Sequence, residues 1–296
     1  MGTSFKLTPI NASFIAEITE IDLGKDLSPR LIAEIHDAMN TYAAVVFRDQ
    51  ALTDEQQLAF GSALGTLEAT RATVNVHQQR LKHSTMGDIS NLGANGQLLA
   101  ADDRRRMFNL GNQLWHSDSS FKATPAMYSM LHARVIPPKG GQTEVADMRA
   151  AWDALPDDTK NEIKDLVVEH SLLYSRAILG FTDFTPSERE TFAPVQQRLV
   201  RYMPATNRRS LFLSSHIGRV LGWPVPESLS LVRDLMEHAT DRRFVYSHDW
   251  RVNDLLMWDN RTTMHRGRPY EDKRYPRDMR RVTTMDTAPT LQQQAA

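Results

Sequence analysis

One short segment of the chain carries two side chains that can bind the same metal ion. His116 and Asp118, in Leu-Trp-His-Ser-Asp, are separated by a single residue. Side chains alternate along an extended segment, so both would project to the same side. An isolated pair of this kind is common, and a surface turn would explain it equally well. The pair becomes informative only when a distant residue completes the site.

A third candidate ligand, His265, lies far downstream in Met-Trp-Asp-Asn-Arg-Thr-Thr-Met-His. Two histidines and one carboxylate on one face of a metal leave its other positions free, which is typical of non-haem Fe(II) oxygenases. Zinc sites favour a closed or nearly closed tetrahedral shell. The chain has no cysteine, so any metal must be held by His, Asp or Glu. The pattern therefore favours iron at these three residues.

Two arginines follow the distal histidine and suggest a binding site for a carboxylate. Arg277 and Arg281 are four residues apart, a spacing that puts both on one face of a strand. A planar guanidinium binds a carboxylate through two parallel hydrogen bonds. A diacid cosubstrate needs such a partner for the carboxylate that does not touch the metal. Taken singly, either arginine is equally well explained as part of a solvated strand edge.

Composition excludes several classes of protein. The 296 residues include 35 Lys and Arg against 36 Asp and Glu, a net charge of -1. This balance argues against a nucleic-acid or membrane-surface binder, which usually carries an excess of basic residues. No apolar run reaches the roughly 18 residues of a transmembrane helix, and the first residues lack the apolar stretch of a secretory signal. We expect a cytoplasmic protein without a nucleic-acid or membrane partner.

Capping residues and apolar periodicity indicate the elements that position these side chains. Helices are predicted over 28–43, where Ser28 is the N-cap, from Thr53 to Gly65, and over 147–155, 157–168 and 226–239. The last of these helices should turn Leu229, Val232, Leu235 and Met236 inward. Strands are predicted at 44–47, near 88–91, and over 127–136, 244–250, 254–260 and 281–286. Early helices followed by strands with helical insertions favour a β-sandwich or barrel with helical decoration.

The chain is interpreted as a single domain over residues 1–296. Residues 66–112 are polar and rich in turn residues, and they contain the run Asp-Asp-Arg-Arg-Arg. Long loops in compact domains are often functional, so this stretch is interpreted as an active-site lid or loop region. Residues 287–296 end in Leu-Gln-Gln-Gln-Ala-Ala and are predicted to form a flexible tail.

Beyond these local patterns, the sequence resembles the taurine / 2,4-dichlorophenoxyacetate dioxygenase family, and within it the aryloxyalkanoate dioxygenases. The resemblance extends from about Ile21 to Asp286. It is carried by FRDQALTDEQQLAF, DISN, NQLWHSDSSF, YSML, PPKGGQTEVADMRAAWDALP, EHATDRRFVYSHDW, DLLMWDNRTTMHRGRPY and RRVTT. In combination these motifs are far more specific than the His-x-Asp pair alone.

The resemblance implies a mainly β fold with helical decoration around a double-stranded β-helix, the jelly roll of cupin-like proteins. It also implies that Fe(II) binds 2-oxoglutarate and O₂ as cosubstrates to oxidise a small carboxylate substrate, and by analogy a homo-oligomer. The resemblance implies that His116, Asp118 and His265 bind the iron. It implies that Thr143 and Arg277 bind the distal carboxylate of 2-oxoglutarate, and that Arg281 contacts the C1 carboxylate of 2-oxoglutarate or the substrate carboxylate. Asn112 and His216 are implied to contact the substrate.

Several positions depart from the aryloxyacetate pattern. Thr73 and Gln97 stand where the enzymes of this group carry two lysines that help to hold substrate, and Met203 replaces an expected histidine. Arg71 is a candidate replacement cation. The implied reaction is cleavage of an aryloxyacetate ether, of the 2,4-dichlorophenoxyacetate type, to a phenol and glyoxylate, with succinate and CO₂.

Three alternatives remain open at this point. The same machinery could act on an aryloxypropionate, a sulfonate, a sulfate ester or another organic acid. The triad could hold zinc in a hydrolase, which would need neither Thr143 nor Arg277. A sensor could keep the fold without turnover, although intact ligands and arginines argue against this.

Overall fold

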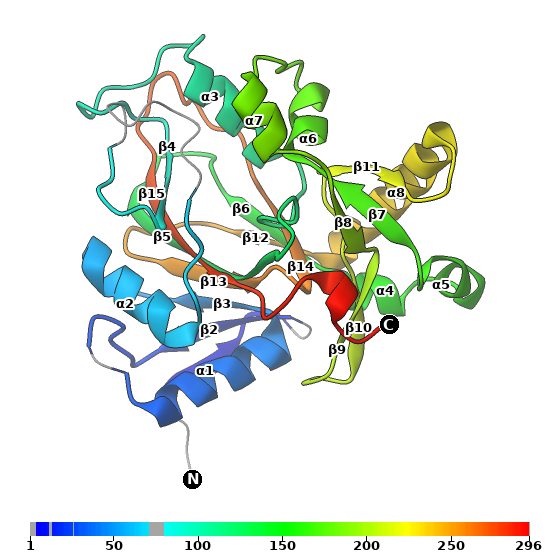
Figure 1. The fold of residues 1–296 in the computed structure, drawn as a ribbon. Helices are drawn as coiled ribbons and strands as arrows, with labels where there is room; N and C mark the ends of the chain where they lie inside the picture. Colours follow the sequence, from blue (N-terminus) through cyan, green and yellow to red (C-terminus); the bar gives the residue numbers. More distant parts are fainter. Residues whose placement is uncertain (1–3, 12–13, 26, 71–79, 296) are drawn as a thin grey trace.

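The computed structural model describes residues 4–11, 14–25, 27–70 and 80–295. Two facing β-sheets form its centre (Figure 1). The larger sheet has the strand order β1-β2-β3-β13-β5-β15-β4, with antiparallel pairing except between β2 and β3. Its strands are β1 Lys6–Pro9, β2 Ile15–Thr19, β3 Ala44–Phe47, β13 Leu255–Asp259, β5 Ala126–Val135, β15 Asp278–Met285 and β4 Met86–Ser90.

The smaller facing sheet carries one of the candidate ligands. Its order is β12-β6-β14, all antiparallel, with strands β12 Val245–His248, β6 Thr143–Asp147 and β14 Thr263–Gly267. Two peripheral sheets complete the β structure: β11 Ile217–Val220, β7 Val167–His170 and β8 Val195–Arg198 in one, β9 Val200–Met203 and β10 Arg208–Leu211 in the other. The two central sheets form the jelly-roll core, as predicted.

Helices cover both sides of this core. Figure 1 shows α1 and α2 against one face of the larger sheet, and α3, α6 and α7 gathered at the opposite end of the molecule. The α-helices are α1 Pro29–Tyr42, α2 Asp54–Leu64, α3 Arg104–Asn109, α4 Met148–Asp153, α5 Asp157–Ile163, α6 Leu172–Ile178, α7 Pro186–Thr191 and α8 Val225–Ala239. Short 3₁₀ helices lie at η2 Leu110–Gln113, η3 Arg242–Phe244 and η4 Thr290–Gln292. None of the helices in these described ranges has the length and apolar content needed to cross a membrane.

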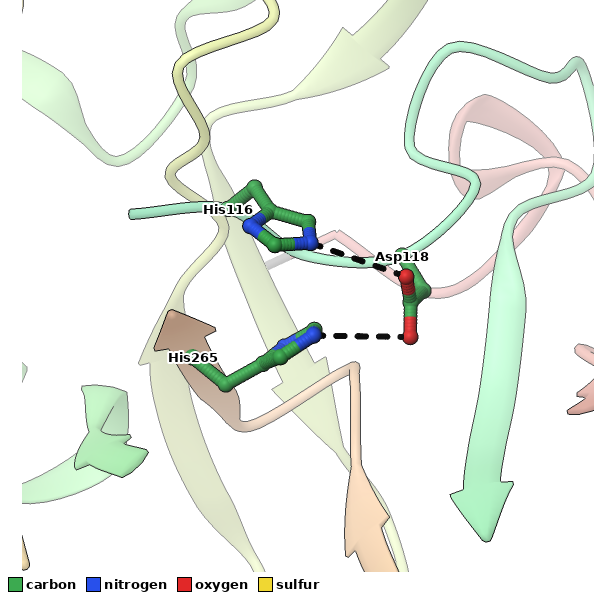
Figure 2. A group of neighbouring side chains, drawn as sticks. All are labelled: His116, Asp118 and His265. Carbon is green, nitrogen blue, oxygen red and sulfur yellow. Dashed lines mark ion pairs between the residues drawn. The ribbon is translucent and has the colours of Figure 1, made fainter. Parts of the chain in front are cut away.

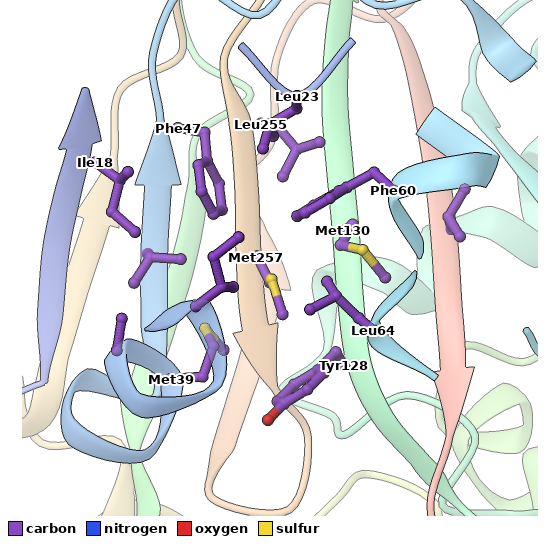
Figure 3. Packing of buried hydrophobic residues seen from close by; sticks show 14 of the residues in the cluster. Ile18, Leu23, Met39, Phe47, Phe60, Leu64, Tyr128, Met130, Leu255 and Met257 are labelled. Atoms are coloured by element: carbon purple, nitrogen blue, oxygen red, sulfur yellow. The ribbon is translucent and has the colours of Figure 1, made fainter. Parts of the chain in front are cut away.

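Strand β13 shows why the sequence Leu-Leu-Met-Trp is apolar without alternation. Leu255 and Met257 face the cluster beneath α1 and α2 (Figure 3). Leu256 and Trp258 face a second cluster, which contains residues of both central sheets. Since successive side chains point to opposite faces and both faces are covered, every position is buried. Strand β13 is therefore enclosed between two layers of buried side chains.

Most predicted elements are confirmed, including the N-cap at Ser28 and the capping box at Thr53. The predicted helix 157–168 is too long, because α5 ends at Ile163 and residues from Val167 pair in β7. Leu229 was predicted to point inward, but its side chain is 48% exposed. The helical pattern does not show where the edge of the buried stripe falls.

The predicted flexible tail at 287–296 is wrong for its first half. Thr290 is buried, and its Oγ1 donates a hydrogen bond to Gln197 Oε1 at 2.6 Å. Gln293 accepts a hydrogen bond from the buried Arg201. These polar partners bind the segment to β8 and β9, a long-range effect that a polar composition does not reveal.

Candidate active site

Backbone pairing brings the two candidate histidine ligands together. His116 lies outside any strand of several residues, but it forms an antiparallel bridge with His265 of β14. The main-chain N–H of each residue donates to the carbonyl of the other, at 3.0 and 2.9 Å. The two imidazole centroids lie 4.2 Å apart. Two residues separated by 149 positions (265 − 116) are thus fixed side by side by main-chain hydrogen bonds.

Asp118 completes the group, as Figure 2 shows. Its Oδ1 lies 3.7 Å from His116 Nε2, and its Oδ2 lies 3.6 Å from His265 Nε2. All three candidate donor atoms lie within 4.8 Å of one another, and all three side chains are buried. As predicted, the side chains of His116 and Asp118 project to the same side of the segment. The chain then turns away at Ser119, which has a φ of 51°.

The protonation states of these groups suit a metal ion. His116 Nδ1 lies 2.7 Å from the carbonyl oxygen of Leu114, an interaction that leaves Nε2 free to accept a metal. Burial lowers the pKa of both histidines, so they are neutral near pH 7. Burial alone would raise the pKa of Asp118, but the Arg281 guanidinium and the hydrogen bond from Ser129 hold it well below its usual range. Two neutral imidazoles and one carboxylate are the donors that ferrous iron accepts.

Hydrogen bonds orient the Asp118 carboxylate. Ser129 Oγ on β5 donates to Asp118 Oδ2 at 2.7 Å, and Arg281 Nη1 donates to Oδ1 at 2.5 Å. The side chain of Asn260 accepts from the Asp118 amide and from the Trp258 indole, at 3.0 Å each. Partners of this kind fix the direction of a ligand, and their loss commonly weakens metal binding.

A cavity of about 120 Å³ opens on one side of the triad. It is lined by His116, His265, Thr143 and both predicted arginines. Thr143 Oγ1 accepts a hydrogen bond from Trp250 Nε1 at 3.2 Å. Arg277 precedes β15 and is only 8% exposed, and burial lowers its pKa to about 10. A buried cation and a hydroxyl thus face a small space that ends at the triad, which suits the far carboxylate of a short diacid.

A second, larger cavity of about 310 Å³ reaches the triad from the other side. Asn112, His116 and Arg281 line both cavities, whereas Asp118 and His216 line the larger one. Its walls include the aromatic side chains Phe108, Phe121 and Phe192. The size and the apolar walls suit an organic substrate with an aromatic or aliphatic body.

His216 lies close to the triad without belonging to it. Its ring centroid is 6.0 Å from that of His116 and 4.9 Å from that of Phe121. His216 Nδ1 lies 2.8 Å from Ser175 Oγ. The predicted substrate contacts of His216 and Asn112 therefore have a cavity to act in.

Two of the positions that depart from the aryloxyacetate pattern, Gln97 and Met203, lie away from both cavities. Gln97 is exposed and does not line either cavity, and its side chain accepts a hydrogen bond from the Asn95 amide. Met203 is buried at the end of β9, also away from both. Arg71 and Thr73 lie outside the described residues.

Sequence reasoning missed two buried charged residues of the larger cavity, Glu68 and Arg176. Arg176 on α6 lines the larger cavity and is 5% exposed. A signal was available, because Arg176 follows Leu172 by four residues and so shares the buried face of the helix.

The jelly roll and the His-Asp-His group together define a metal-dependent dioxygenase. The family model described as "Taurine catabolism dioxygenase TauD, TfdA family" matches residues 3–283, so the chain belongs to this family.

Among its relatives, the chain is 45% identical to the alpha-ketoglutarate-dependent 2,4-dichlorophenoxyacetate dioxygenase of Cupriavidus pinatubonensis, over 95% of this chain and 97% of that one. It is 35% identical to the (S)-phenoxypropionate/alpha-ketoglutarate-dioxygenase of Sphingobium herbicidovorans, over 92% of each. A crystal structure of AAD-2 in complex with Mn(II) and N-oxalylglycine matches at a TM-score of 0.93 and 52% identity, covering 97% of this chain and 99% of that one.

Proposed function

We propose that the chain is an Fe(II)- and 2-oxoglutarate-dependent dioxygenase that hydroxylates the ether CH₂ carbon of an aryloxyacetate. One oxygen atom of O₂ enters the substrate, and the other enters succinate as 2-oxoglutarate loses CO₂. The hydroxylated carbon is a hemiacetal, which collapses to a phenol and glyoxylate. The observation that carries the proposal is the placement of the triad between a small cavity with a buried guanidinium and a larger aromatic cavity.

In this proposal His116, Asp118 and His265 hold the iron and leave the remaining coordination positions for ligands. Bound iron(II) supplies the activation of O₂ and the removal of hydrogen from the substrate carbon. Thr143 and Arg277 bind the distal carboxylate of 2-oxoglutarate, so the cosubstrate has one orientation.

Arg281 donates to Asp118 and borders both cavities, so it is placed to meet the C1 carboxylate of 2-oxoglutarate or the substrate carboxylate. Asn112 and His216 contact the substrate. Arg71 as a further cation, a lid formed by residues 66–112, a cytoplasmic location and a homo-oligomer stay predictions.

Two features support an aryloxyacetate over other acids. The relative named for 2,4-dichlorophenoxyacetate is 45% identical to the chain, against 35% for the one named for (S)-phenoxypropionate. The larger cavity has three phenylalanines in its wall, as expected for a site that holds an aryl ring.

The test is a panel of substrates with the purified protein, Fe(II), 2-oxoglutarate and O₂. Succinate release should rise with 2,4-dichlorophenoxyacetate, and phenol and glyoxylate should form in amounts equal to the succinate. A faster release with an aryloxypropionate, a sulfonate or a sulfate ester would keep the dioxygenase and reassign its substrate. Turnover with zinc and without 2-oxoglutarate would instead support the hydrolase alternative.

A further inference from the structure

The larger cavity contains a positive charge for which the reaction outlined above has no use. It belongs to Arg176, on the helix α6. Ser171 caps this helix, and its buried residues are Leu172, Ser175 and Arg176. The fold thus turns an arginine inward, on the same face as a leucine, and into the cavity where the substrate would lie.

The guanidinium of Arg176 is closely packed, but only some of its N–H groups have hydrogen-bond partners. Its carbon lies 4.3 Å from the ring centroid of Phe108, and Nη1 donates to Ser175 Oγ at 3.1 Å. The group also packs against Gly111 so closely that a Cβ built on this glycine would lie 2.2 Å from Nη1. Nε is buried and has no hydrogen-bond partner within the described residues.

A comparison of the buried arginines shows what is missing. In the described part of the chain four arginines are buried, and Arg149 and Arg201 pair with Asp147 and Asp286. Arg176 and Arg277 form no ion pair with an acidic side chain anywhere in the described ranges. Burying an unpaired charge is unfavourable, so a fold keeps it where a ligand supplies the opposite charge.

Each of the two unpaired arginines lines one of the two cavities beside the triad. Arg277 lines the smaller cavity and Arg176 the larger one, with the triad between them. Burial lowers the pKa of each to about 10, so both are still charged near neutral pH. Since Arg277 is placed to receive the distal carboxylate of the cosubstrate, the equivalent partner for Arg176 is an anionic group of the primary substrate.

Other cations that line the larger cavity in the described residues are already engaged, among them Arg281, which donates to Asp118. Lys122 forms an ion pair with Glu68 at 2.6 Å, and Arg80 pairs with Asp88 and Asp278. Arg105 is partly exposed and donates to the carbonyl oxygen of Leu92.

We propose that Arg176 binds the carboxylate of the primary substrate through the Nη2 end of its guanidinium, since Nη1 donates to Ser175 and Nε is enclosed beside Gly111. A charged N–H donor of this kind forms a strong hydrogen bond with a carboxylate oxygen. Phe108 then positions the guanidinium, while Phe121 and Phe192 enclose the aryl ring. The inference rests on the proposed function, and it identifies the residue that makes the enzyme prefer an acid over its neutral analogue.

The experiment compares phenoxyacetate with phenoxyacetamide, which has nearly the same shape without the charge. Binding is measured without oxygen by calorimetry, on protein loaded with Mn(II) and 2-oxoglutarate. Arg176→Gln should weaken phenoxyacetate binding at least about 100-fold, the scale of losing one partner of a buried charge pair. Binding of phenoxyacetamide should change less than about threefold, and Arg176→Lys should restore part of the affinity for the acid.

Arg105→Gln is the matched control, because it removes the same charge from the wall of the same cavity. It should leave the preference for the acid unchanged. Succinate release in the absence of primary substrate should be the same in wild type and Arg176→Gln, which shows that the cosubstrate site is intact.

An equal loss of acid and amide binding in Arg176→Gln would overturn the proposal, since it would show a role in cavity shape alone. Unchanged binding of the acid would also overturn it and assign the carboxylate to another cation, such as Arg281. In both cases wild type still binds phenoxyacetate and the proposed function stands. If wild type itself binds no aryloxyacetate, the proposed substrate falls and the inference falls with it.

Discussion

The two cavities share one wall at the triad but are built from different kinds of structure. Strands form much of the smaller cavity, with Leu131 on β5, Thr143 on β6, Trp258 on β13 and His265 on β14. The larger cavity has β4 and β15 along one wall, but the rest of its lining comes from the short helices α3 and α6 and from turns. Paired strands hold side chains more exactly than loops do, and loops tolerate more change. In the proposed function, the cavity with more of its wall in the central strands would hold the cosubstrate, and the other would hold the substrate.

The largest effect is expected from substitutions in the triad, which lies between the two cavities. His116→Ala and Asp118→Ala should each lower turnover more than about 100-fold, because even the outer partners of metal ligands are worth 10- to 100-fold. Both substrate oxidation and the release of succinate without substrate should be lost. Bound iron, measured by metal analysis after gel filtration, should fall in parallel.

Circular dichroism and thermal unfolding serve as the control, since both variants should keep the fold. Full turnover by either variant with added Fe(II) would contradict the ligand assignment.

A substitution in the smaller cavity should raise KM for 2-oxoglutarate and leave KM for the primary substrate nearly unchanged. Arg277→Gln removes the buried cation, and we expect KM for 2-oxoglutarate to rise about 100-fold while KM for the aryloxyacetate changes little. Steady-state kinetics with each compound varied in turn measures both values. Arg266→Gln is a matched control, because this arginine pairs with Glu144 and lies outside both cavities. An unchanged KM for 2-oxoglutarate in Arg277→Gln would remove Arg277 from the site.

A substitution in the larger cavity should raise KM for the primary substrate and leave KM for 2-oxoglutarate nearly unchanged. Phe121→Ala removes apolar contact from the larger cavity, and we expect KM for the aryloxyacetate to rise about tenfold, equivalent to about 1.4 kcal/mol of lost contact. KM for 2-oxoglutarate should stay within twofold. If both constants rise together, the two sides are coupled and the separation between them is not real.

The smallest effect concerns acid stability on the substrate side. His170 is fully buried beside Ser120 behind the larger cavity, and burial lowers its pKa to about 3. Its pKa in the unfolded chain is about 6.5. Below this pH the unfolded chain therefore binds a proton that the folded chain does not, so the free energy of unfolding falls as pH falls.

From pH 6.5 to 5.5 this single group should lower the free energy of unfolding by about 1 kcal/mol. Urea unfolding of wild type and His170→Gln at both pH values measures the effect. The variant should lose less stability over this interval, and a loss equal to that of wild type would show that His170 is protonated in the folded state.

Local patterns were enough to predict much of the fold and one pair of candidate ligands. The spacing of His116 and Asp118 and the caps at Ser28 and Thr53 depend on neighbours in sequence, and all appear in the structure as predicted. His265 was proposed as the third candidate ligand from residue type and the 2-His-1-carboxylate pattern, but its main-chain bridge to His116 could not be predicted, because the bridge joins residues with no local relation.

Arg176 was missed because a charged residue in a short helix is ordinarily a solvated one. Its spacing from Leu172 is a weak sign of burial, and the packing of α6 against Phe108 of α3 and Gly111 of η2 establishes it. Arg277 was predicted on a strand together with Arg281. It lies just before β15, with a register shift at Asp278 between them, yet both side chains line the smaller cavity.

The main-chain bridge between His116 and His265 has a consequence for laboratory recombination. Neither of its two hydrogen bonds depends on the side chains of α6 or on Phe192, which form part of the wall of the larger cavity. A chimaera that takes residues 171–193 from another member of the family should therefore keep its iron affinity while acquiring a different substrate range. This stretch then works as an exchangeable cassette on a constant oxidising scaffold.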